Sequence, residues 1–516
     1  MPRVLPRPWK SCSARGRRWR RLSRGCRGCR RPQAPNCCAR PMTPCKGIWR
    51  RRAAAALKRR PAPCGGCRNC CGSCLSRREK AYGEKKEILP DRKSPGWPEK
   101  MDGIFMRQSA GHFLSRRLLI SMLVLGLIGI SLWAIWFFRQ KLRGLSPVVF
   151  GPAGNVVALV SQGNGVLNYP PEFSLSIFAE GLDGPRVLTV DPAGTLLVSL
   201  PAAGKVVALP DGDGNGRADR VVEVIGGLKR PHGLAFAPGA DRRLFVAETD
   251  RVMAYEYDPV TMQAGPGAEI AGLPGGGRHF SRSLLFMPPP DEDKLLISVG
   301  SSCDTCVEED WRRAKILVLD PDGGEPRIFA AGLRNAVFMT LHPATGEIWA
   351  TEMGRDHLGD NLPPDEINII KAGRDYGWPS CYGNNTADGE FLGPGAISGA
   401  CLTKTPSFID LPAHSAPLGL AFFPARGGWP EKYRGNLLVA YHGSWNRTMP
   451  TGYKIVLFRF DRQGKLLGRE DFISGWLLPD NTSLGRPVDI RIMEDRIFIS
   501  DDKAGVIYQL TMRGNP

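Results

Sequence analysis

A histidine follows three glycines in the stretch GGGRHFSRSLLF, from Gly275 to Phe286. His279 lies just before an apolar run with strand character, and a neutral imidazole there can act as a general base near pH 7. A single histidine more often only caps a loop. Arg334 and Asn335, in the stretch GLRNAVF, lie in the same position before a later apolar run. If the fold brings the starts of these two strands together, a catalytic role for His279 is favoured.

Two cations lie beside apolar strands: Arg334, and Lys454 in the stretch GYKIVLF. Burying such a charge is costly unless an anion pairs with it. A ligand with several carboxylates would supply that anion, because arginine can bind a carboxylate through two hydrogen bonds. Ordinary salt bridges to Asp or Glu, or a solvated strand end, are the alternatives.

The stretch PPDEINIIKAGRDYGWPSCYG, from Pro363 to Gly383, opens with two adjacent carboxylates, Asp365 and Glu366. With main-chain carbonyls from the preceding loop and from Tyr376, they would form an all-oxygen set of the kind that Ca²⁺ prefers. A solvated acidic pair at a strand end is the alternative. Composition alone does not decide between the two.

One pattern recurs six times: a short apolar strand, a turn with Pro, Asp or Gly, a second apolar strand, a gap and a third strand. The six units begin at Pro185, Pro231, Arg282, Arg334, Pro417 and Arg486. Three or four antiparallel strands per unit predict an all-β fold, a six-bladed β-propeller. The innermost strands of a propeller line one channel, so the polar residues at their starts should converge at its mouth: His232, His279, Arg334, Asn335 and Arg486.

The net charge of +20 comes from the first part of the chain. Residues 1–100 hold 29 Lys and Arg against 5 Asp and Glu, whereas residues 146–516 carry a net charge of −9. The main body therefore has no basic groove for nucleic acid, and we expect no nucleic-acid partner.

Residues 1–100 are rich in Arg, Cys, Pro and Gly and show no apolar periodicity. We expect a disordered segment or a mis-annotated start, because Met101 opens a stretch typical of the beginning of a membrane protein. The CxxC spacings between Cys64 and Cys74 offer zinc binding as the alternative.

Residues 101–145 contain an apolar run without a charge, from Leu118 to Phe138. Its 21 residues are enough to cross a hydrocarbon core of about 30 Å as a helix. The run is longer than that of a signal peptide, and no small-residue cleavage site follows it. We predict one uncleaved, single-pass membrane anchor. The flanking charges nearly balance and do not orient it.

The four cysteines of the body form two close pairs in sequence, Cys303 with Cys306 and Cys381 with Cys401. Such pairs favour an oxidising compartment, and four reduced thiols are the alternative. Combined with the anchor, this predicts a protein of the cell inner membrane whose domain 146–516 lies in the periplasm.

Four segments in order carry a family resemblance: AGLPGGGRHFSRSLLF, GLRNAVFMTLHPATGEIWATE, LPPDEINIIKAGRDYGWPSCYG and HGSWNRTMPTGYKIVLFRF. They resemble the soluble glucose dehydrogenase and L-sorbosone dehydrogenase family, quinoproteins that use pyrroloquinoline quinone (PQQ). The resemblance spans about residues 165–512, and HGSWNR is closer to the sorbosone dehydrogenase branch. It implies a six-bladed propeller with PQQ and Ca²⁺ at the channel mouth.

The resemblance also implies roles for single residues. His279 matches the general base that takes the proton of a sugar hydroxyl while hydride passes to the quinone. Arg334 and Asn335 match the pair beside the quinone carbonyl, with Arg334 taking part in catalysis as well. Lys454 and Arg486 match the cations that bind the PQQ carboxylates.

The calcium site follows from the same resemblance. The main-chain oxygens of Gly354 and Arg355 match ligands of the Ca²⁺ that polarises PQQ, a Lewis-acid role. Asp365, Glu366 and Tyr376 would bind calcium nearby.

Two positions depart from the family pattern. Arg278 stands where glucose dehydrogenase has an Asp before its catalytic His, which argues against glucose as the substrate. Leu484 stands where a second cofactor-binding Arg is expected, two residues before Arg486.

The predicted function is a PQQ- and calcium-dependent dehydrogenase that oxidises an aldose sugar or sugar aldehyde and passes electrons to a quinone or a cytochrome. A propeller that binds a ligand or partner without redox chemistry is one alternative. A calcium-dependent lactonase is the other, although the several side-chain carboxylates that hold its metal are not evident at these strand starts.

Overall fold

A computed structural model describes residues 109–141, 145–163, 165–239, 241–395, 399–493 and 495–514 of the chain. The predicted segment 1–100, with its CxxC spacings, lies outside the described residues.

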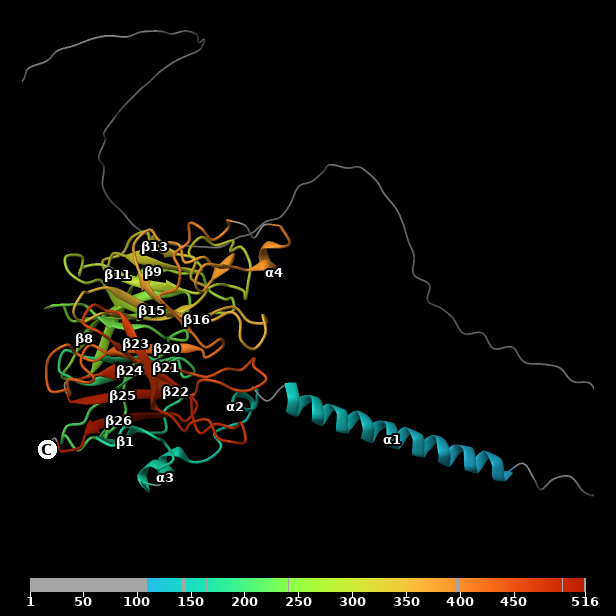
Figure 1. Ribbon diagram of the computed structural model, residues 1–516. Helices are drawn as coiled ribbons and strands as arrows, with labels where there is room; N and C mark the ends of the chain where they lie inside the picture. Colours follow the sequence, from blue (N-terminus) through green and yellow to red (C-terminus); the bar gives the residue numbers. More distant parts are fainter. Residues whose placement is uncertain are drawn as a thin grey trace, which may run out of the picture. The chain divides into compact units, whose positions relative to one another are not determined.

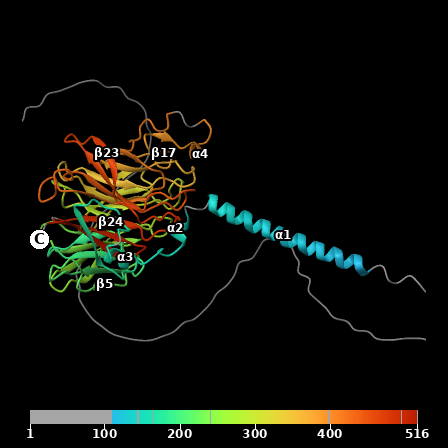
Figure 2. The same cartoon turned by 60° about the horizontal axis from the view of Figure 1, so that its bottom comes forward.

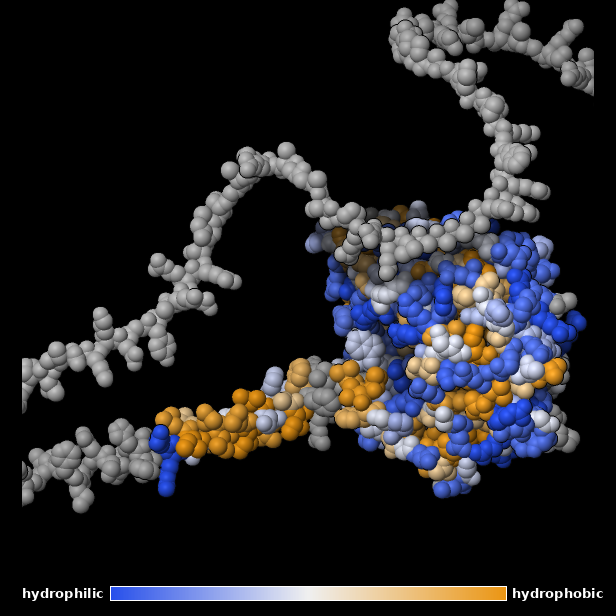
Figure 3. All heavy atoms as spheres, turned by 180° about the vertical axis from the view of Figure 1, so that it is seen from behind, coloured by the Kyte–Doolittle hydropathy of each residue, from blue (hydrophilic) through white to orange (hydrophobic). Residues whose placement is uncertain are grey.

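One long helix, α1 (Ser109–Lys141), contains the apolar run predicted as an anchor. Within it, Arg116–Phe137 is long and apolar enough to cross a membrane, as judged by length and composition. Figure 3 shows a largely apolar surface along the part of this helix whose side chains are described. Two short helices follow in the chain, α2 (Ser146–Val149) and α3 (Val156–Ser161).

In the remaining described chain, six four-stranded antiparallel sheets form the blades of a propeller (Figure 1). The prediction of six blades is confirmed. The first two blades consist of β2 (Leu188–Val190), β3 (Leu196–Leu200), β4 (Lys205–Leu209) and β5 (Val222–Ile225), and of β6 (Leu234–Phe236), β7 (Arg243–Ala247), β8 (Arg251–Asp258) and β9 (Gln263–Gly272). The third consists of β10 (Leu284–Phe286), β11 (Leu295–Val299), β12 (Lys315–Leu319) and β13 (Arg327–Ala331).

The fourth blade consists of β14 (Ala336–Leu341), β15 (Ile348–Glu352), β16 (Asp365–Ile370) and β19 (Ile409–Leu411). The fifth consists of β20 (Pro417–Phe422), β21 (Leu437–Tyr441), β22 (Lys454–Phe460) and β23 (Leu466–Ile473). The sixth combines β24 (Pro487–Ile492), β25 (Arg496–Asp501) and β26 (Val506–Met512) with β1 (Phe173–Ala179).

The first strand of each repeat is the innermost strand of its blade, and strand direction alternates outward from it. All innermost strands therefore begin at the same end of the propeller, which we call the cavity face. Side-chain hydroxyls link neighbouring blades there: Thr351 donates to the Leu418 carbonyl at 2.7 Å, and Ser500 donates to the Arg186 carbonyl at 2.6 Å. The apolar core lies between adjacent blades, because both faces of most inner strands are buried.

The ring closes through β1, which pairs with β26 from Phe173 opposite Met512 to Ala179 opposite Ile507. The sixth repeat supplies only three strands, and the chain segment before the first repeat supplies the fourth. Phe173 is fully buried, and its ring lies 5.3 Å from Phe472 and 5.5 Å from Tyr433. This aromatic cluster joins the closing strand to the fifth blade.

One insertion interrupts the fourth blade between β16 and β19. It contains the hairpin β17 (Cys381–Tyr382) and β18 (Thr386–Ala387) and the short helix α4 (Gly389–Leu392). A disulfide between Cys381 and Cys401 closes it. Figures 1 and 2 show this insertion at the edge of the propeller.

Replacing Phe173 by Ala should lower the free energy of unfolding by about 3–5 kcal/mol, because it removes a buried ring from the strand that closes the propeller. Chemical denaturation of the full chain measures the change. Leu467→Ala is the matched control, because this side chain on β23 is 65% exposed and should cost less than about 0.5 kcal/mol. Equal effects of the two substitutions would contradict the role of β1 in closure.

Candidate active site

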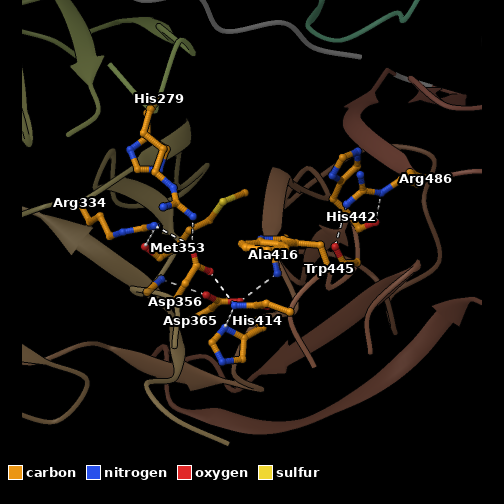
Figure 4. Close-up of a pocket in the computed structure, with 14 residues that line it drawn as sticks. His279, Arg334, Met353, Asp356, Asp365, His414, Ala416, His442, Trp445 and Arg486 are labelled. Atoms are coloured by element: carbon orange, nitrogen blue, oxygen red, sulfur yellow. Dashed lines mark hydrogen bonds and ion pairs between the residues drawn. The ribbon is translucent and has the colours of Figure 1, made fainter. Parts of the chain in front are cut away.

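A cavity of about 260 Å³ lies where the innermost strands begin. Figure 4 shows His279 and Arg334 on one side of it and His442 and Arg486 on the other. The lining residues come from the third to the sixth blade: Arg278, His279, Arg334, Met353, Gly354, Asp356, Asp365, His414, Ala416, His442, Gly443, Trp445, Asn446 and Arg486. The propeller thus unites residues that are more than 200 positions apart in the chain.

The hydrogen bonds of His279 determine which of its nitrogens carries the proton. Nδ1 lies 3.0 Å from the carbonyl oxygen of Ser301. A carbonyl only accepts, so Nδ1 donates and Nε2 keeps its lone pair. Burial, and then the charge of Arg334, lowers the pKa of His279 to about 3. The imidazole is therefore neutral at pH 7, with a free basic nitrogen.

Arg334 is buried at the start of β14 and has two acidic neighbours. Its Nη2 donates to Asp304 at 2.7 Å and lies 3.4 Å from Asp356. Its Nε donates to the Asp304 carbonyl at 3.0 Å, so Asp304 is held through both side chain and main chain. Asp356 also pairs with Arg278 and accepts a hydrogen bond from Asn446 at 2.7 Å.

The disulfide Cys303–Cys306 encloses Asp304 in a four-residue loop. The Ser301 hydroxyl, 3.0 Å from His279 Nδ1, donates to the Cys303 carbonyl at 2.7 Å. One loop therefore positions both His279 and Arg334. Among the described residues, Cys303, Cys306 and Glu308 lie close enough together to bind a metal, but both sulfurs are in the disulfide.

The opposite wall is built around Arg486. Its guanidinium donates to the main-chain carbonyls of His442, at 3.1 Å, and Gly443, at 2.8 Å. It makes no ion pair within the part of the chain that the structure describes. Burial lowers its pKa. His442 Nε2 lies 2.9 Å from Asp502, and burial, followed by the charge of Arg486, lowers the pKa of this imidazole to about 4.

The adjacent carboxylates Asp365 and Glu366 point to opposite faces of β16, as successive strand residues do. Asp365 faces the cavity and accepts hydrogen bonds from the amides of Gly354, at 3.0 Å, and Ala416, at 2.9 Å. Glu366 faces a different, smaller cavity and accepts from Asn368 at 2.9 Å. The two carboxylates therefore do not converge on one cation.

The smaller cavity, of about 20 Å³, lies between β15, β16 and the insertion. Predicted metal-binding residues lining it are Gly354, Arg355, Glu366 and Tyr376. Glu352 and Asp388 add two further carboxylates. Glu352 lies directly opposite Glu366 in the sheet, and its buried Oε2 has no hydrogen-bond partner among the described residues. Two buried glutamates side by side, one of them unsatisfied, are a donor set that a cation would complete.

Burial, and then the neighbouring Glu366, raises the pKa of Glu352 well above its ordinary value. Burial raises the pKa of Glu366 to about 6. A bound divalent cation would offset both effects. Gly354 separates the two cavities, and a Cβ there would lie 2.7 Å from the Pro364 carbonyl, so the close backbone approach requires glycine.

The other predicted residues lie in different surroundings. Lys454 does not line the cavity; it begins β22, a third strand, and its amine lies 2.7 Å from Asp471. Asn335 is buried next to His279, and a Cβ on Gly300 would contact both residues at 2.7 Å. The Arg355 guanidinium pairs with Asp388 at 2.9 Å. The Tyr376 hydroxyl donates to the Ile369 carbonyl at 2.6 Å, which leaves its main chain for any ligand role.

Sequence reasoning did not identify several residues of the site. Asp304 and Asp356 compensate the charges of the buried Arg334 and the exposed Arg278, and Glu352 completes the smaller cavity. His442 lines the opposite wall of the larger cavity. Glu352 is the last residue of a second strand, and His442 directly follows the second strand of the next repeat, so both lie at the cavity face. Applying the convergence argument to second strands as well as to first strands would have found them.

A family model described as TrAA12-like matches residues 167–513. The chain belongs to the TrAA12-like family. The matched residues agree with the range of about 165–512 inferred from the motifs, and the predicted resemblance to PQQ-dependent sugar dehydrogenases is confirmed.

Relatives of known sequence are distant. An uncharacterised protein of Borreliella burgdorferi is 28% identical over 360 residues, which cover 67% of this chain and 90% of that protein. A pyrroloquinoline quinone-dependent pyranose dehydrogenase of Coprinopsis cinerea is 27% identical over 335 residues. This match covers 56% of this chain and only 44% of the Coprinopsis protein.

Several solved structures share the fold. The PQQ domain of Coprinopsis cinerea pyranose dehydrogenase, in its holo form, has a TM-score of 0.58 and 23% identity. A calcium structure of the AA12 enzyme of Trichoderma reesei has a TM-score of 0.59 and 22% identity. Each match covers 67% of this chain and 97% of the other. At this identity the likeness shows the propeller fold.

Replacing both Cys303 and Cys306 by Ser should loosen the loop that positions His279 and Arg334, since the covalent link no longer limits its opening. We expect at least tenfold faster hydrogen exchange at the amides of Arg278 and Ser301, which donate to Ser302 and Arg334 carbonyls at 2.8 and 2.7 Å. The matched control replaces Cys381 and Cys401 and should affect only the insertion. Unchanged exchange at Arg278 and Ser301 would contradict the positioning role.

Proposed function

We propose that this protein is a PQQ-dependent dehydrogenase that oxidises an aldose sugar or sugar aldehyde. The observation that carries the proposal is the cavity itself, which joins a neutral imidazole, His279, to three arginines, Arg278, Arg334 and Arg486. A base beside fixed cations suits proton removal from a hydroxyl next to an anionic acceptor. The names of the TrAA12-like relatives support the same class of reaction.

The residues of the cavity fit an anionic cofactor. Arg486 is desolvated and donates only to main-chain carbonyls among its described hydrogen bonds. A guanidinium partly withdrawn from solvent without a carboxylate partner is costly, and a carboxylate of PQQ would relieve that cost. Arg334, in contrast, already has Asp304 and Asp356 beside it, so it would present a partly neutralised cation to the quinone. Lys454, which pairs with Asp471 outside the cavity, contributes less support to this set.

The proposed chemistry assigns the proton to this chain. Bound PQQ would supply the oxidant that accepts hydride from the sugar carbon. His279 Nε2 accepts the proton of the sugar hydroxyl, and the Ser301 carbonyl stabilises the imidazolium through Nδ1–H. Arg334 holds the carboxylates of Asp304 and Asp356 in place through its ion pairs. Arg278 lines the cavity beside His279. Its ion pair with Asp356 fixes a guanidinium at the position where glucose dehydrogenase has an Asp.

Calcium would be held at the smaller cavity by Glu352 and Glu366, with main-chain oxygens of Gly354, Arg355 and Tyr376. The unsatisfied Glu352 Oε2 supports this assignment. Asp365 faces the larger cavity, where it holds Gly354 and Ala416 in place rather than completing the same ligand set. A cation beside the cofactor would polarise it as a Lewis acid.

For the finer assignments, the HGSWNR segment supports a sorbosone dehydrogenase-like substrate. We propose that α1 anchors the chain in the cell inner membrane, that residues 101–145 form the anchor region, and that residues 146–516 form a periplasmic catalytic domain. The disulfides Cys303–Cys306 and Cys381–Cys401 support an oxidising compartment.

His279→Ala should leave PQQ binding unchanged and lower the rate of sugar oxidation by about 10²–10⁴, because only the proton acceptor is removed. Dye reduction and PQQ titration of the full chain measure the two quantities. His342→Gln, directly after the other end of β14, is the control and should keep its rate. A His279→Ala variant with full activity would remove the proposed base.

The pH profile provides an independent test. Activity should fall as the pH drops through the pKa of His279, because protonation fills the Nε2 lone pair. Burial and the arginine charges hold that pKa below its ordinary value of 6.5. Arg278→Met removes one of those charges, so the acid limb of kcat/KM should move to higher pH. Arg242→Met, on the opposite face, should leave the limb in place, and no shift in Arg278→Met would contradict the account.

Calcium binding should depend on the paired glutamates of the smaller cavity. Glu352→Gln and Glu366→Gln should each weaken Ca²⁺ binding at least tenfold in calorimetric titrations, because each removes a charged ligand. Glu390→Gln is the matched control, since this nearby carboxylate is 63% exposed on its side chain and pairs with Arg355. Equal affinity in all variants would place any calcium elsewhere.

A further inference from the structure

The segment that links α1 to the propeller is fixed on the sixth blade. The carbonyl of Pro147 accepts hydrogen bonds from Lys503 Nζ, at 2.6 Å, and from the Ser483 hydroxyl, at 3.2 Å. The amide of Ala153 donates to the Ser483 carbonyl at 3.0 Å. Ser146 and Pro147 are buried. Residues 145–153, which we call the linker segment, therefore have a defined place on the propeller.

That place is on the cavity face. Ser483 lies three residues before Arg486, which lines the cavity, and Lys503 follows Asp502, the partner of His442. One oxygen of Asp501, Oδ1, accepts hydrogen bonds from the amides of both Arg486, at 2.7 Å, and Lys503, at 3.1 Å, so the two residues are close. The linker segment thus contacts the same wall of the cavity that holds Arg486.

The chain allows little separation between α1 and this face. The helix ends at Lys141 and the linker segment begins at Leu145, so four residue steps connect them. Fully extended, four steps reach about 14 Å. The opposite face lies a full strand length farther away, about 20 Å for six residues. An anchor in the membrane would therefore hold the cavity face, not the opposite face, beside the lipid.

The cavity face also exposes apolar side chains suited to that position. In the linker segment, Val149 is 67% exposed and Phe150 is 52% exposed. Across the cavity, Trp445 is 39% exposed and lines its mouth, and Leu362 is 48% exposed. The loops that carry Trp445 and Leu362 are held together, because the Thr448 amide donates to Asp360 at 3.0 Å.

We propose that the cavity face of the propeller rests on the lipid bilayer, with Val149, Phe150 and Trp445 in contact with its interface. The inference rests on the proposed membrane anchoring by α1. Tryptophan at such a position suits the boundary between headgroups and hydrocarbon. Substrate and electron acceptor would then reach the cavity from the membrane–water interface rather than from bulk solvent.

Photo-crosslinking to lipid tests the contact. The full chain is reconstituted in vesicles of phosphatidylethanolamine and phosphatidylglycerol, with p-benzoylphenylalanine replacing Ile128, Phe150, Trp445 or Val260 in turn. Ile128 lies in α1 and reports the anchor. Val260 is 83% exposed in the turn after β8, on the opposite face, and is the matched control. We expect lipid adducts from the first three positions, with at least tenfold more at Trp445 than at Val260.

The outcomes separate the two claims. Adducts at Ile128 but only control levels at Trp445 would overturn the orientation while keeping the anchor. No adduct at Ile128 would overturn the anchor and the orientation together. Lys503→Met removes a contact of the linker segment, so it should lower the Trp445 adduct severalfold and leave the Ile128 adduct unchanged; an unchanged Trp445 adduct would contradict the orienting role of the linker segment.

Discussion

The buried charge of Arg334 is the constraint around which the cavity is arranged. A guanidinium cannot give up its proton at physiological pH, so its burial must be compensated by anions and carbonyls. Asp304 supplies both a carboxylate and a main-chain carbonyl to it, and Asp356 adds a second carboxylate. The Arg334 carbonyl in turn accepts the Ser301 amide, which places the oxygen that orients His279. Cation, base and disulfide-closed loop therefore form one connected unit.

The propeller makes this unit possible because strand starts from several blades meet at one face. Each blade contributes a few polar residues to a cavity whose walls are otherwise built from buried strands. On the far wall, the guanidinium of Arg486 donates hydrogen bonds to two main-chain carbonyls and lies over the ring of Tyr453, and it has no ion pair among the described residues. The two walls therefore differ: one is already neutralised, and the other is prepared for an anionic ligand. A planar, multiply charged cofactor between them would explain the asymmetry.

Much of the fold and part of the site could be predicted from the sequence. The six repeats marked the innermost strands, and the polar residues before them included His279, Arg334 and Arg486, all of which line the cavity. Closure of the propeller ring was not predictable, because the closing strand β1 lies before the first repeat in the chain and pairs with a strand of the last repeat. Lys454 was expected to bind the cofactor, but it begins the third strand of its blade and therefore lies away from the cavity. Counting repeats does not reveal this distance from the channel.

The acidic residues illustrate the other limit. Adjacent in sequence, Asp365 and Glu366 suggested one cation site, whereas the alternation of a β-strand sends them into two cavities. The true neighbour of Glu366 is Glu352, fourteen positions earlier and opposite in the sheet. Such a pairing depends on strand register, which follows from the length of the connecting loop and the packing of both strand faces. Compensation of Arg334 by Asp304 likewise depends on a loop conformation that the disulfide helps to define.

The cavity is proposed to bind PQQ and to oxidise a sugar. The most direct test is optical. The full chain is incubated with PQQ and CaCl₂, freed of excess cofactor, and a panel of aldoses and sugar aldehydes is added while the absorption of the bound quinone is recorded. We expect a bound quinone spectrum that at least one sugar bleaches to the quinol form. Absence of any bound quinone would contradict this proposal and would favour a propeller that binds its ligand without redox chemistry.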